Sequence, residues 1–201
     1  MRFVLASASP ARLATLRRAG VEPEVIVSGV DESAITADSP AELVGRLADL
    51  KAQAVADLVD GPALVLGCDS LLEFDGLTVG KPGSAEAAAE RWRQLRGGTG
   101  RLHTGHCLIE TATGATVRRT VSTLVRFADP TDAEIERYCN TGEPETVAGA
   151  FTIDGLGGWF VEGIEGDPHN VVGVSLPALR HMLHELAYDL TDLGYAAAPI
   201  R

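Results

Sequence analysis

Hydrophobic runs alternate with amphipathic segments along the chain, and this alternation predicts a succession of strands and helices. Short apolar runs at residues 2–6 and 24–30 are typical of strands. Residues 63–74 form a longer run that is apolar on both faces, as expected of a buried strand. Residues 147–164 predict a strand, a glycine turn and a second strand.

Segments with helical periodicity separate these runs, and most of them begin at a recognisable N-cap. Serine or threonine followed by proline or by an acidic residue three positions later marks a helix start. The predicted helices begin after Ser9, Ser39, Ser84 and Thr131, and a last helix spans residues 176–190. The helix that follows Ser39 should run to about Leu58.

Two turn signals add antiparallel strands to this pattern. Asp75-Gly76 should turn the 63–74 strand back through a short partner, and Thr113-Gly114 should join two long extended segments. We therefore expect an α/β fold in which an elongated mixed sheet is flanked by helices around a central cleft. The absence of a linker or composition shift predicts one domain over residues 1–201, with two lobes.

Composition and charge narrow the class of partner. The chain has 201 residues, 45% of them hydrophobic and 22% charged, and its formal net charge is -11. An acidic chain offers no basic surface to polymeric nucleic acid. The N-terminus does not resemble a signal peptide, no segment has the length of a membrane span, and the three cysteines lack disulfide or zinc spacing. We expect a cytoplasmic protein without a membrane partner.

The most informative polar residue is Asp69, which interrupts the buried 63–74 strand. An ionised carboxylate in such a place is costly unless it is paired, hydrogen-bonded or bound to a metal. Lys51 is comparably placed, because it shares a helix face with Val44, Leu47 and Ala54. Taken alone, that lysine could simply extend from the edge of the core into water.

The segment "LASASPAR" leads from a strand through a tight loop directly into a helix. Free N–H groups of a first helical turn, the hydroxyls of Ser7 and Ser9, and the guanidinium of Arg12 together suit a phosphate. An ordinary N-cap beside a surface arginine explains the same residues about as well.

Three further segments carry polar residues of interest: "VGKPGS" with Lys81, "VDES" with Glu32, and the loop "GDPHNVVG" at 166–173. Each could be an ordinary solvated loop. Together, however, two carboxylates, two lysines, an arginine and a phosphate-shaped turn are what a metal-assisted reaction on a polyphosphate requires.

These residues fall within motifs of a known family. In order along the chain they read "LASASPAR", "VSGVDES", "RLADLKA", "GCDSL", "GKP", "TGHCLI", "AGAFTIDGLGG" and "NVVGVSLPAL". The chain resembles the Maf family, septum-formation-inhibitor-like proteins that are nucleoside triphosphate pyrophosphatases. The resemblance implies a fold like that of the inosine triphosphate pyrophosphatases. It also implies hydrolysis between the α- and β-phosphates, which yields a nucleoside monophosphate and pyrophosphate.

The resemblance assigns roles to individual residues. Asp69 matches the family's proton acceptor and would contact a metal together with Glu32. The phosphate-binding residues would be Ser7, Ser9, Arg12, Lys51 and Lys81. Oxygen ligands and phosphates suit Mg²⁺ or Mn²⁺. On this interpretation a metal or its bound water would compensate the buried charge of Asp69.

Departures from the family pattern cluster at positions that sort substrates. They are Ala11, where a basic or bulky residue is usual, Ser70, where Thr or Gln is frequent, and Asp154, where Gln or Glu is common. An ionised Asp154 can accept hydrogen bonds from a base but cannot donate one. We therefore expect broad base specificity, which would suit removal of modified nucleotides.

Two other functions remain open at this stage. The family name refers to septum formation, so the chain could be a regulator of cell division that binds nucleotides with little turnover. A general phosphohydrolase would instead release orthophosphate. The resemblance also suggests a homodimer.

Overall fold

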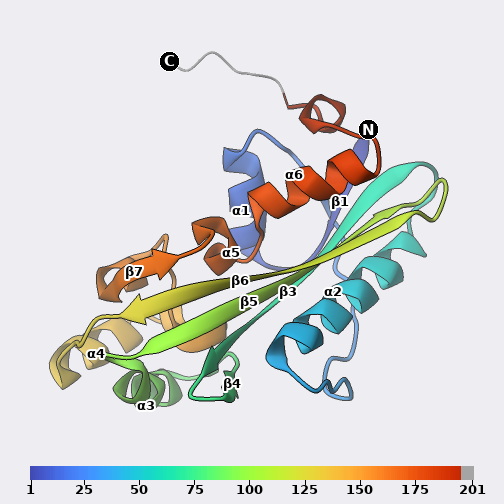
Figure 1. Cartoon of the computed structure of the whole chain (residues 1–201). Helices are drawn as coiled ribbons and strands as arrows, with labels where there is room; N and C mark the ends of the chain where they lie inside the picture. Colours follow the sequence, from blue (N-terminus) through green and yellow to red (C-terminus); the bar gives the residue numbers. More distant parts are fainter. Residues whose placement is uncertain (196–201) are drawn as a thin grey trace, which may run out of the picture. The chain divides into compact units, whose positions relative to one another are not determined.

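The computed structural model describes residues 1–195 and contains a mixed sheet flanked by helices (Figure 1). Its seven strands are β1 (Arg2–Ala6), β2 (Glu24–Val25), β3 (Ala63–Phe74), β4 (Leu77–Val79), β5 (Thr99–Glu110), β6 (Thr116–Phe127) and β7 (Val161–Glu165). Their order is β2-β1-β3-β5-β6-β7, and β4 pairs with β3. The pairs β1–β2 and β1–β3 are parallel, whereas β3–β4 and β6–β7 are antiparallel. The predicted mixed α/β class is confirmed.

The α-helices are α1 (Pro10–Arg18), α2 (Pro40–Ala56), α3 (Ala85–Leu95), α4 (Asp132–Cys139), α5 (Pro168–Val172) and α6 (Leu176–Glu185). Short 3₁₀ helices are η1 (Glu143–Thr146), η2 (Ala148–Ala150), η3 (Leu156–Phe160) and η4 (Leu190–Leu193). The predicted caps Ser9, Ser39, Ser84 and Thr131 all accept a backbone N–H from the first helical turn. Within the described chain, every helix is too short or too polar to serve as a membrane span.

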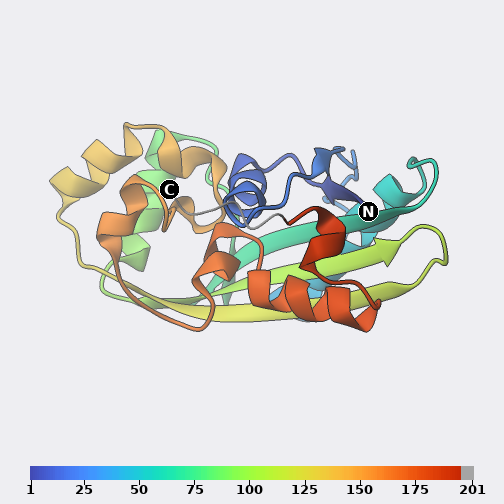
Figure 2. The ribbon, with the colours of Figure 1, turned by 90° about the horizontal axis from the view of Figure 1, so that it is seen from above.

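The chain divides into two compact units. The first contains Met1–Asp69, Thr104–Val121 and the residues from Gly173 onward, and the second contains Ser70–His103 and Ser122–Val172. The long strands β3, β5 and β6, which are neighbours in the sheet, run side by side for much of their length (Figure 2).

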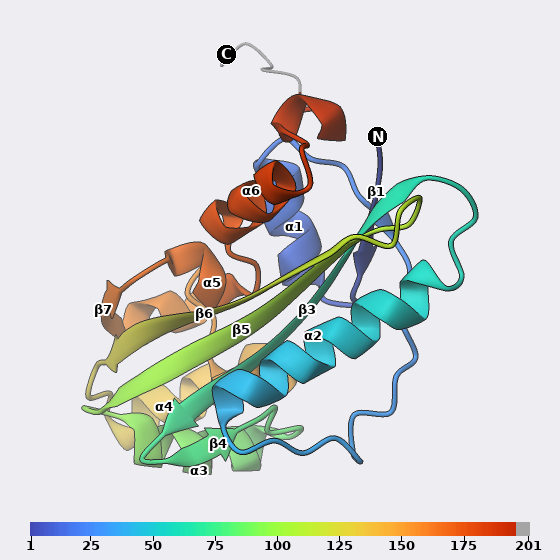
Figure 3. The same cartoon turned by 45° about the vertical axis from the view of Figure 1, so that its right-hand side comes forward.

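In the first unit, helices cover both faces of the sheet (Figure 3). Successive side chains of a strand point to opposite faces. Val4 of β1 accordingly belongs to a buried cluster with Val55 of α2, whereas Leu5 belongs to another with Leu16 of α1 and Met182 of α6. Because both faces are covered, β1 after Arg2 and the first half of β3 are apolar, as the sequence predicted.

Two glycines let α2 lie unusually close to the strands. A Cβ at Gly67 of β3 would be 2.2 Å from the Ala48 carbonyl oxygen, and one at Gly105 of β5 would be 2.1 Å from that of Val44. Real Cβ atoms do not approach so near, so any side chain here would push the helix outward. The backbone of α2 therefore rests directly on the sheet.

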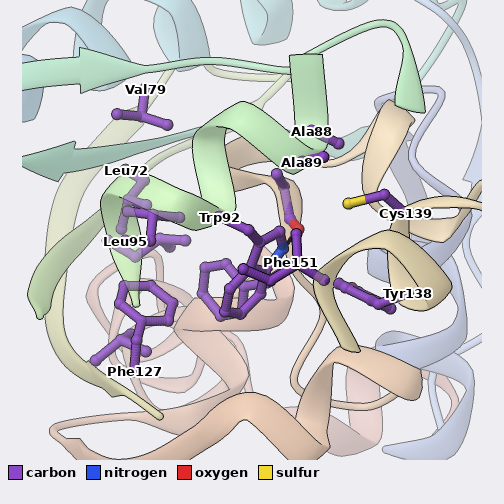
Figure 4. Close-up of a cluster of buried hydrophobic side chains, with 14 residues drawn as sticks. Leu72, Val79, Ala88, Ala89, Trp92, Leu95, Phe127, Tyr138, Cys139 and Phe151 are labelled. Carbon is purple, nitrogen blue, oxygen red and sulfur yellow. Dashed lines mark hydrogen bonds between the residues drawn. The ribbon is translucent and has the colours of Figure 1, made fainter. Parts of the chain in front are cut away.

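In the second unit, aromatic side chains fill the core beneath α3 and α4 (Figure 4). The Trp92 ring packs edge-on against Phe127 and Tyr138, with ring centroids 5.7 Å apart in each pair. Its indole Nε1 donates a 2.8 Å hydrogen bond to the Ala150 carbonyl. Satisfying this buried donor ties η2 to α3.

Three predicted boundaries were wrong, and a residue with positive φ lies near each of them. The strand expected over 24–30 ends at Val25, and Gly29 turns the chain away with φ +64°. The strands expected within 147–164 are reduced to β7, because Gly149 and Ala150 take φ +74° and +60° and the chain forms η2 and η3 instead. The last helix stops at Glu185, shortly before Ala187 with φ +61°.

Candidate active site

The loop between β1 and α1 contains a buried arginine. Ser9 caps α1 by accepting the Arg12 N–H at 3.4 Å. The Arg12 side chain donates from Nη1 to Ser7 Oγ at 2.9 Å and from Nε to the Gly173 carbonyl at 2.8 Å. Its guanidinium is thus held in one orientation at the N-terminus of α1. A fixed positive charge there favours binding of an anion.

Close packing of α2 brings a lysine over β3. The Ala48 carbonyl lies over Gly67, and Lys51 follows Ala48 by three residues while Asp69 follows Gly67 by two. Lys51 and Asp69 therefore meet on the same side of the sheet, with Nζ 2.6 Å from Oδ1. Both side chains are 11% exposed, so this ion pair is largely removed from water.

Glu32 completes the group from the loop after β2. Its Oε1 lies 2.7 Å from the same Lys51 Nζ, and its side chain is 50% exposed. The ammonium of Lys51 therefore bridges one buried and one half-exposed carboxylate. One oxygen of each carboxylate thus lies within hydrogen-bonding distance of the same ammonium nitrogen.

In the structure the Lys51 ammonium compensates the charge of Asp69. The expectation that a metal or its bound water also does so stays a prediction. The same contact corrects the view of Lys51 as a side chain that simply extends into water from the core edge. A charged pair that is hydrogen-bonded in this way is tolerated where a lone carboxylate would not be.

The buried Cys68 thiol shows that the arginine loop and the lysine group belong to one region. In the parallel pair of β1 and β3, Ala6 lies opposite Gly67, so Ser7 leaves the sheet next to Cys68. Burial raises the pKa of Cys68 to about 12, with opposing effects from the charges of Arg12 and Lys51 and a further rise from Asp69. One buried atom thus experiences all three charges.

Comparison with known families decides the identity of this fold and site. The family model described as "Maf-like protein" matches residues 2–186. The chain belongs to the Maf-like family. The resemblance noted from the sequence motifs is therefore confirmed.

Curated relatives of this Maf-like protein carry one name. A protein of Streptomyces coelicolor named nucleoside triphosphate pyrophosphatase is 56% identical over 96% of this chain and 94% of its own length. Another of that name, from Salinispora tropica, is 55% identical over 96% of this chain and 87% of its own length. A solved structure of a nucleoside-triphosphatase (dITP/XTP pyrophosphatase) from Mycobacterium abscessus is 16% identical, covers 65% of this chain and 76% of its own, and has a TM-score of 0.39. A similarity at that level indicates nothing about the function of this protein.

The sequence also predicted four further site residues for this Maf-like protein. Ala11 is half-buried in the first turn of α1, in the first unit. Ser70 follows Asp69 in β3 and begins the second unit. Lys81 is exposed on the loop after β4, and Asp154 is exposed on the segment before η3, both in the second unit. The structure thus brings Glu32, Lys51 and Asp69 into contact, and Ser7, Ser9 and Arg12 into a second contact group.

The donor chemistry around Lys51 fits a divalent cation. Glu32 and Asp69 offer carboxylate oxygens, the ligands that Mg²⁺ and Mn²⁺ prefer. Among residues 1–195, no three His, Cys, Asp or Glu side chains gather as a metal site. Mg²⁺ is commonly held through one or two carboxylates, with water and substrate phosphates supplying the other ligands. Two carboxylates that converge on one cationic group match that pattern.

Sequence reasoning missed two features that hold this site in place. Gly173, whose carbonyl fixes Arg12, ends the 166–173 loop, and nothing in that loop's sequence pattern indicates a contact with Arg12. The glycines at 67 and 105 that admit α2 were not singled out either. A glycine inside a strand is a recognised sign of close backbone approach, so this signal was present in the sequence.

Proposed function

We propose that this Maf-like protein is a metal-dependent nucleoside triphosphate pyrophosphatase that cleaves between the α- and β-phosphates. The observation that carries the proposal is the contact of the Lys51 ammonium with both Asp69 and Glu32, beside the Arg12 loop. The names of relatives at 55–56% identity support it. A fixed guanidinium, a lysine and two carboxylates supply the positive charge and the base that phosphoryl chemistry needs.

Asp69 is the proposed general base. It would accept a proton from the water whose oxygen forms the new bond to the α-phosphorus, while the bridging bond to the β-phosphate breaks and pyrophosphate leaves. Its ion pair with Lys51 holds the carboxylate in one orientation before substrate arrives. A divalent cation, held by Glu32 and Asp69, would contribute neutralisation of phosphate charge.

Basic residues are the proposed phosphate ligands. Arg12, already oriented by Ser7 and Gly173, would bind a phosphate at the N-terminus of α1 together with the hydroxyls of Ser7 and Ser9. Lys51 would exchange part of its contact with carboxylates for contact with the substrate. Lys81, on the loop after β4, is a further proposed phosphate ligand.

The residues proposed to contact the nucleobase offer little selectivity between bases. Ala11 lacks a long side chain, Ser70 offers one hydroxyl, and an ionised Asp154 only accepts hydrogen bonds. Few directional contacts give discrimination of only a few kcal/mol. We expect several nucleoside triphosphates, including modified ones, to be cleaved with similar kcat/KM.

Measuring both phosphate products tests the proposal. Purified protein is incubated with a panel of canonical and modified nucleoside triphosphates and Mg²⁺ or Mn²⁺, and pyrophosphate and orthophosphate are measured separately. Release of pyrophosphate with the nucleoside monophosphate is expected, and chelation of the metal should abolish it. Orthophosphate release would instead indicate a phosphohydrolase. Binding without any release would favour a septum-formation regulator, and one substrate preferred by more than about a thousandfold would refute broad specificity.

A further inference from the structure

Glu143 is a half-buried carboxylate in the second unit that has no part in the chemistry proposed above. It is the first residue of η1, and it accepts four hydrogen bonds. Its Oε1 accepts from the Tyr138 hydroxyl at 2.9 Å, the Thr152 hydroxyl at 2.7 Å and the Gly157 N–H at 2.9 Å, while Oε2 accepts from the Leu156 N–H at 2.9 Å. No lysine or arginine of residues 1–195 forms an ion pair with it, so neutral donors alone hold this carboxylate.

These donors stabilise the ionised form. Burial on its own raises the pKa of Glu143, but the bonds from Thr152, Leu156, Gly157 and Tyr138 together hold it below the usual value of 4.5. At neutral pH the group is therefore an anion that accepts and does not donate. Two of its donors are backbone N–H groups, which need an acceptor if they are to stay out of water.

The segment of residues 152–157 is wrapped closely around this carboxylate. A Cβ at Gly155 would lie 2.5 Å from Glu143 Oε2, and a Cβ at Gly157 would lie 2.4 Å from the Tyr138 hydroxyl oxygen. Any other residue at these positions would displace the segment. Its path is therefore determined by contact with Glu143 and with the tyrosine beside it.

Asp154 sits in the middle of the segment that Glu143 anchors. Thr152 precedes it by two residues and Leu156 follows it by two, and both donate to Glu143. Asp154 itself is exposed, as is Leu156. Hydrogen bonds thus fix the segment on both sides of Asp154, which lies exposed between them.

The same 3₁₀ helix also holds the loop that carries Lys81. The Gly83 N–H donates a 3.0 Å hydrogen bond to the carbonyl of Glu145, two residues after Glu143. On the other side of Lys81, Arg91 donates to the Gly80 carbonyl at 3.2 Å. A shift of η1 would thus move both segments that present proposed substrate contacts in this unit.

We propose that Glu143 is a positioning residue for nucleobase recognition. By accepting hydrogen bonds from both ends of the 152–157 segment, it sets the place of Asp154 and so determines affinity for the base and discrimination between bases. The inference rests on the proposed function, in which Asp154 meets the base. Glu143 contacts no substrate and takes no part in proton transfer.

Glu143→Gln tests the proposal with little change in shape. An amide has one acceptor oxygen and one donor nitrogen, so either Leu156 or Gly157 loses its acceptor. We expect KM to rise about tenfold or more, because bonds to a charged acceptor are among the stronger ones, while kcat changes by less than about threefold. The rise in KM should differ between bases, so the ratios of kcat/KM between bases should change from their wild-type values. Glu162→Gln, which changes an exposed glutamate of β7, is the matched control and should leave KM unchanged.

A second variant covers the case in which Glu143→Gln does not fold. Thr152→Val is nearly isosteric and removes a single donor to Glu143 next to Asp154, so it should shift KM and base preference in the same direction by a smaller factor. A merely structural role would lower Tm in either variant while KM and the base ratios stay as in wild type. That result would overturn the proposal.

Binding of an α,β-methylene nucleoside triphosphate, measured by calorimetry with Mg²⁺ present, separates this inference from the proposed function. Weaker binding in Glu143→Gln, with no pyrophosphate released by wild type, would leave the positioning role standing and refute the pyrophosphatase. Normal pyrophosphate release by wild type, with equal binding in both proteins, would refute the positioning role alone.

Discussion

At the scale of single residues, Asp69 and Lys51 depend on each other. Each is largely buried, and each is tolerated there because the other lies within hydrogen-bonding distance. The same contact occupies one oxygen of the proposed general base. Phosphates that draw Lys51 toward themselves would release Asp69 to accept a proton at the moment of reaction.

Asp69→Asn should therefore remove turnover and preserve binding. Loss of a general base typically costs roughly 10²–10⁴-fold in rate, and the near-isosteric amide leaves Lys51 its contact with Glu32. Pyrophosphate release measures the first effect and calorimetry with a non-hydrolysable nucleotide measures the second. Asp75→Asn, in the hairpin at the end of the same strand, is the control and should be fully active, because asparagine tolerates the positive φ of 49° found there. A loss below about tenfold at Asp69 would mean that its role is structural.

Lys51→Met should destabilise the protein. The helix pattern alone would suggest that replacing a lysine on an apolar face is harmless, but the ion pair reverses this expectation because Asp69 would be left as a buried, unpaired charge. Breaking such a pair from one side costs about 3 kcal/mol. Urea unfolding of the single variant and of the double variant Lys51→Met/Asp69→Leu measures the effect. The double variant should recover most of the lost stability, and a single variant as stable as wild type would show the pair to be unimportant.

At the scale of elements, local signals predicted the fold better than they predicted the site. N-caps, the Asp75-Gly76 turn and the Thr113-Gly114 turn are set by backbone chemistry a few residues long, and all of them were found. The error in 147–164 has another origin. Ala150 and Phe151 do pack inward, but the path of the segment is imposed by the distant Trp92 and Glu143, whose contacts no local pattern reveals.

The same limit applied to the candidate site. Asp69 and Lys51 were both singled out because a charge on an apolar strand or helix face is costly wherever it occurs. The pattern did not show that the two side chains are partners. The approach of α2 to the sheet depends on Gly67 and Gly105, which are far apart in sequence and meet one helix.

Gly67→Ala should lift α2 from the sheet and loosen the contact of Lys51 with Asp69. Overpacking of this kind typically costs about 1–3 kcal/mol. We expect a lower urea midpoint and reduced kcat/KM in the same variant. Gly80→Ala is the control, because a Cβ at Gly80 would meet nothing within 4 Å, and its stability should match wild type. An equally stable Gly67→Ala variant would show that the helix can shift freely.

At the scale of the whole molecule, the two units differ in what they contribute. The first contains the contact groups built around Arg12 and Lys51, and the second contains the segments of Lys81 and Asp154. The formal net charge of -11 makes the molecule as a whole repel polyanions. In the proposed mechanism, binding of a triphosphate would then depend on the few fixed cations and on a divalent metal.

Acid should weaken the second unit through Glu143. The pKa of this group is lowered in the folded protein from its usual 4.5, so its ionisation stabilises the fold above that pH, and the contribution is lost as pH falls through the lower folded value. The Tm difference between wild type and Glu143→Gln should be constant from about pH 6 upward and should shrink below about pH 4.5. Thermal unfolding at a series of pH values measures this. A difference that stays the same down to pH 3 would contradict the assignment.

The burial of Cys68 makes its rate of chemical labelling a measure of how often β3, the strand of Asp69, opens. All three cysteines, Cys68, Cys107 and Cys139, are free and buried, and burial raises the pKa of each. Thiols that are both protonated and covered react slowly with alkylating reagents. Labelling of Cys68 should therefore proceed only as fast as β3 opens, and mass spectrometry of the labelled peptide would time that opening beside the proposed catalytic carboxylate without any engineered probe.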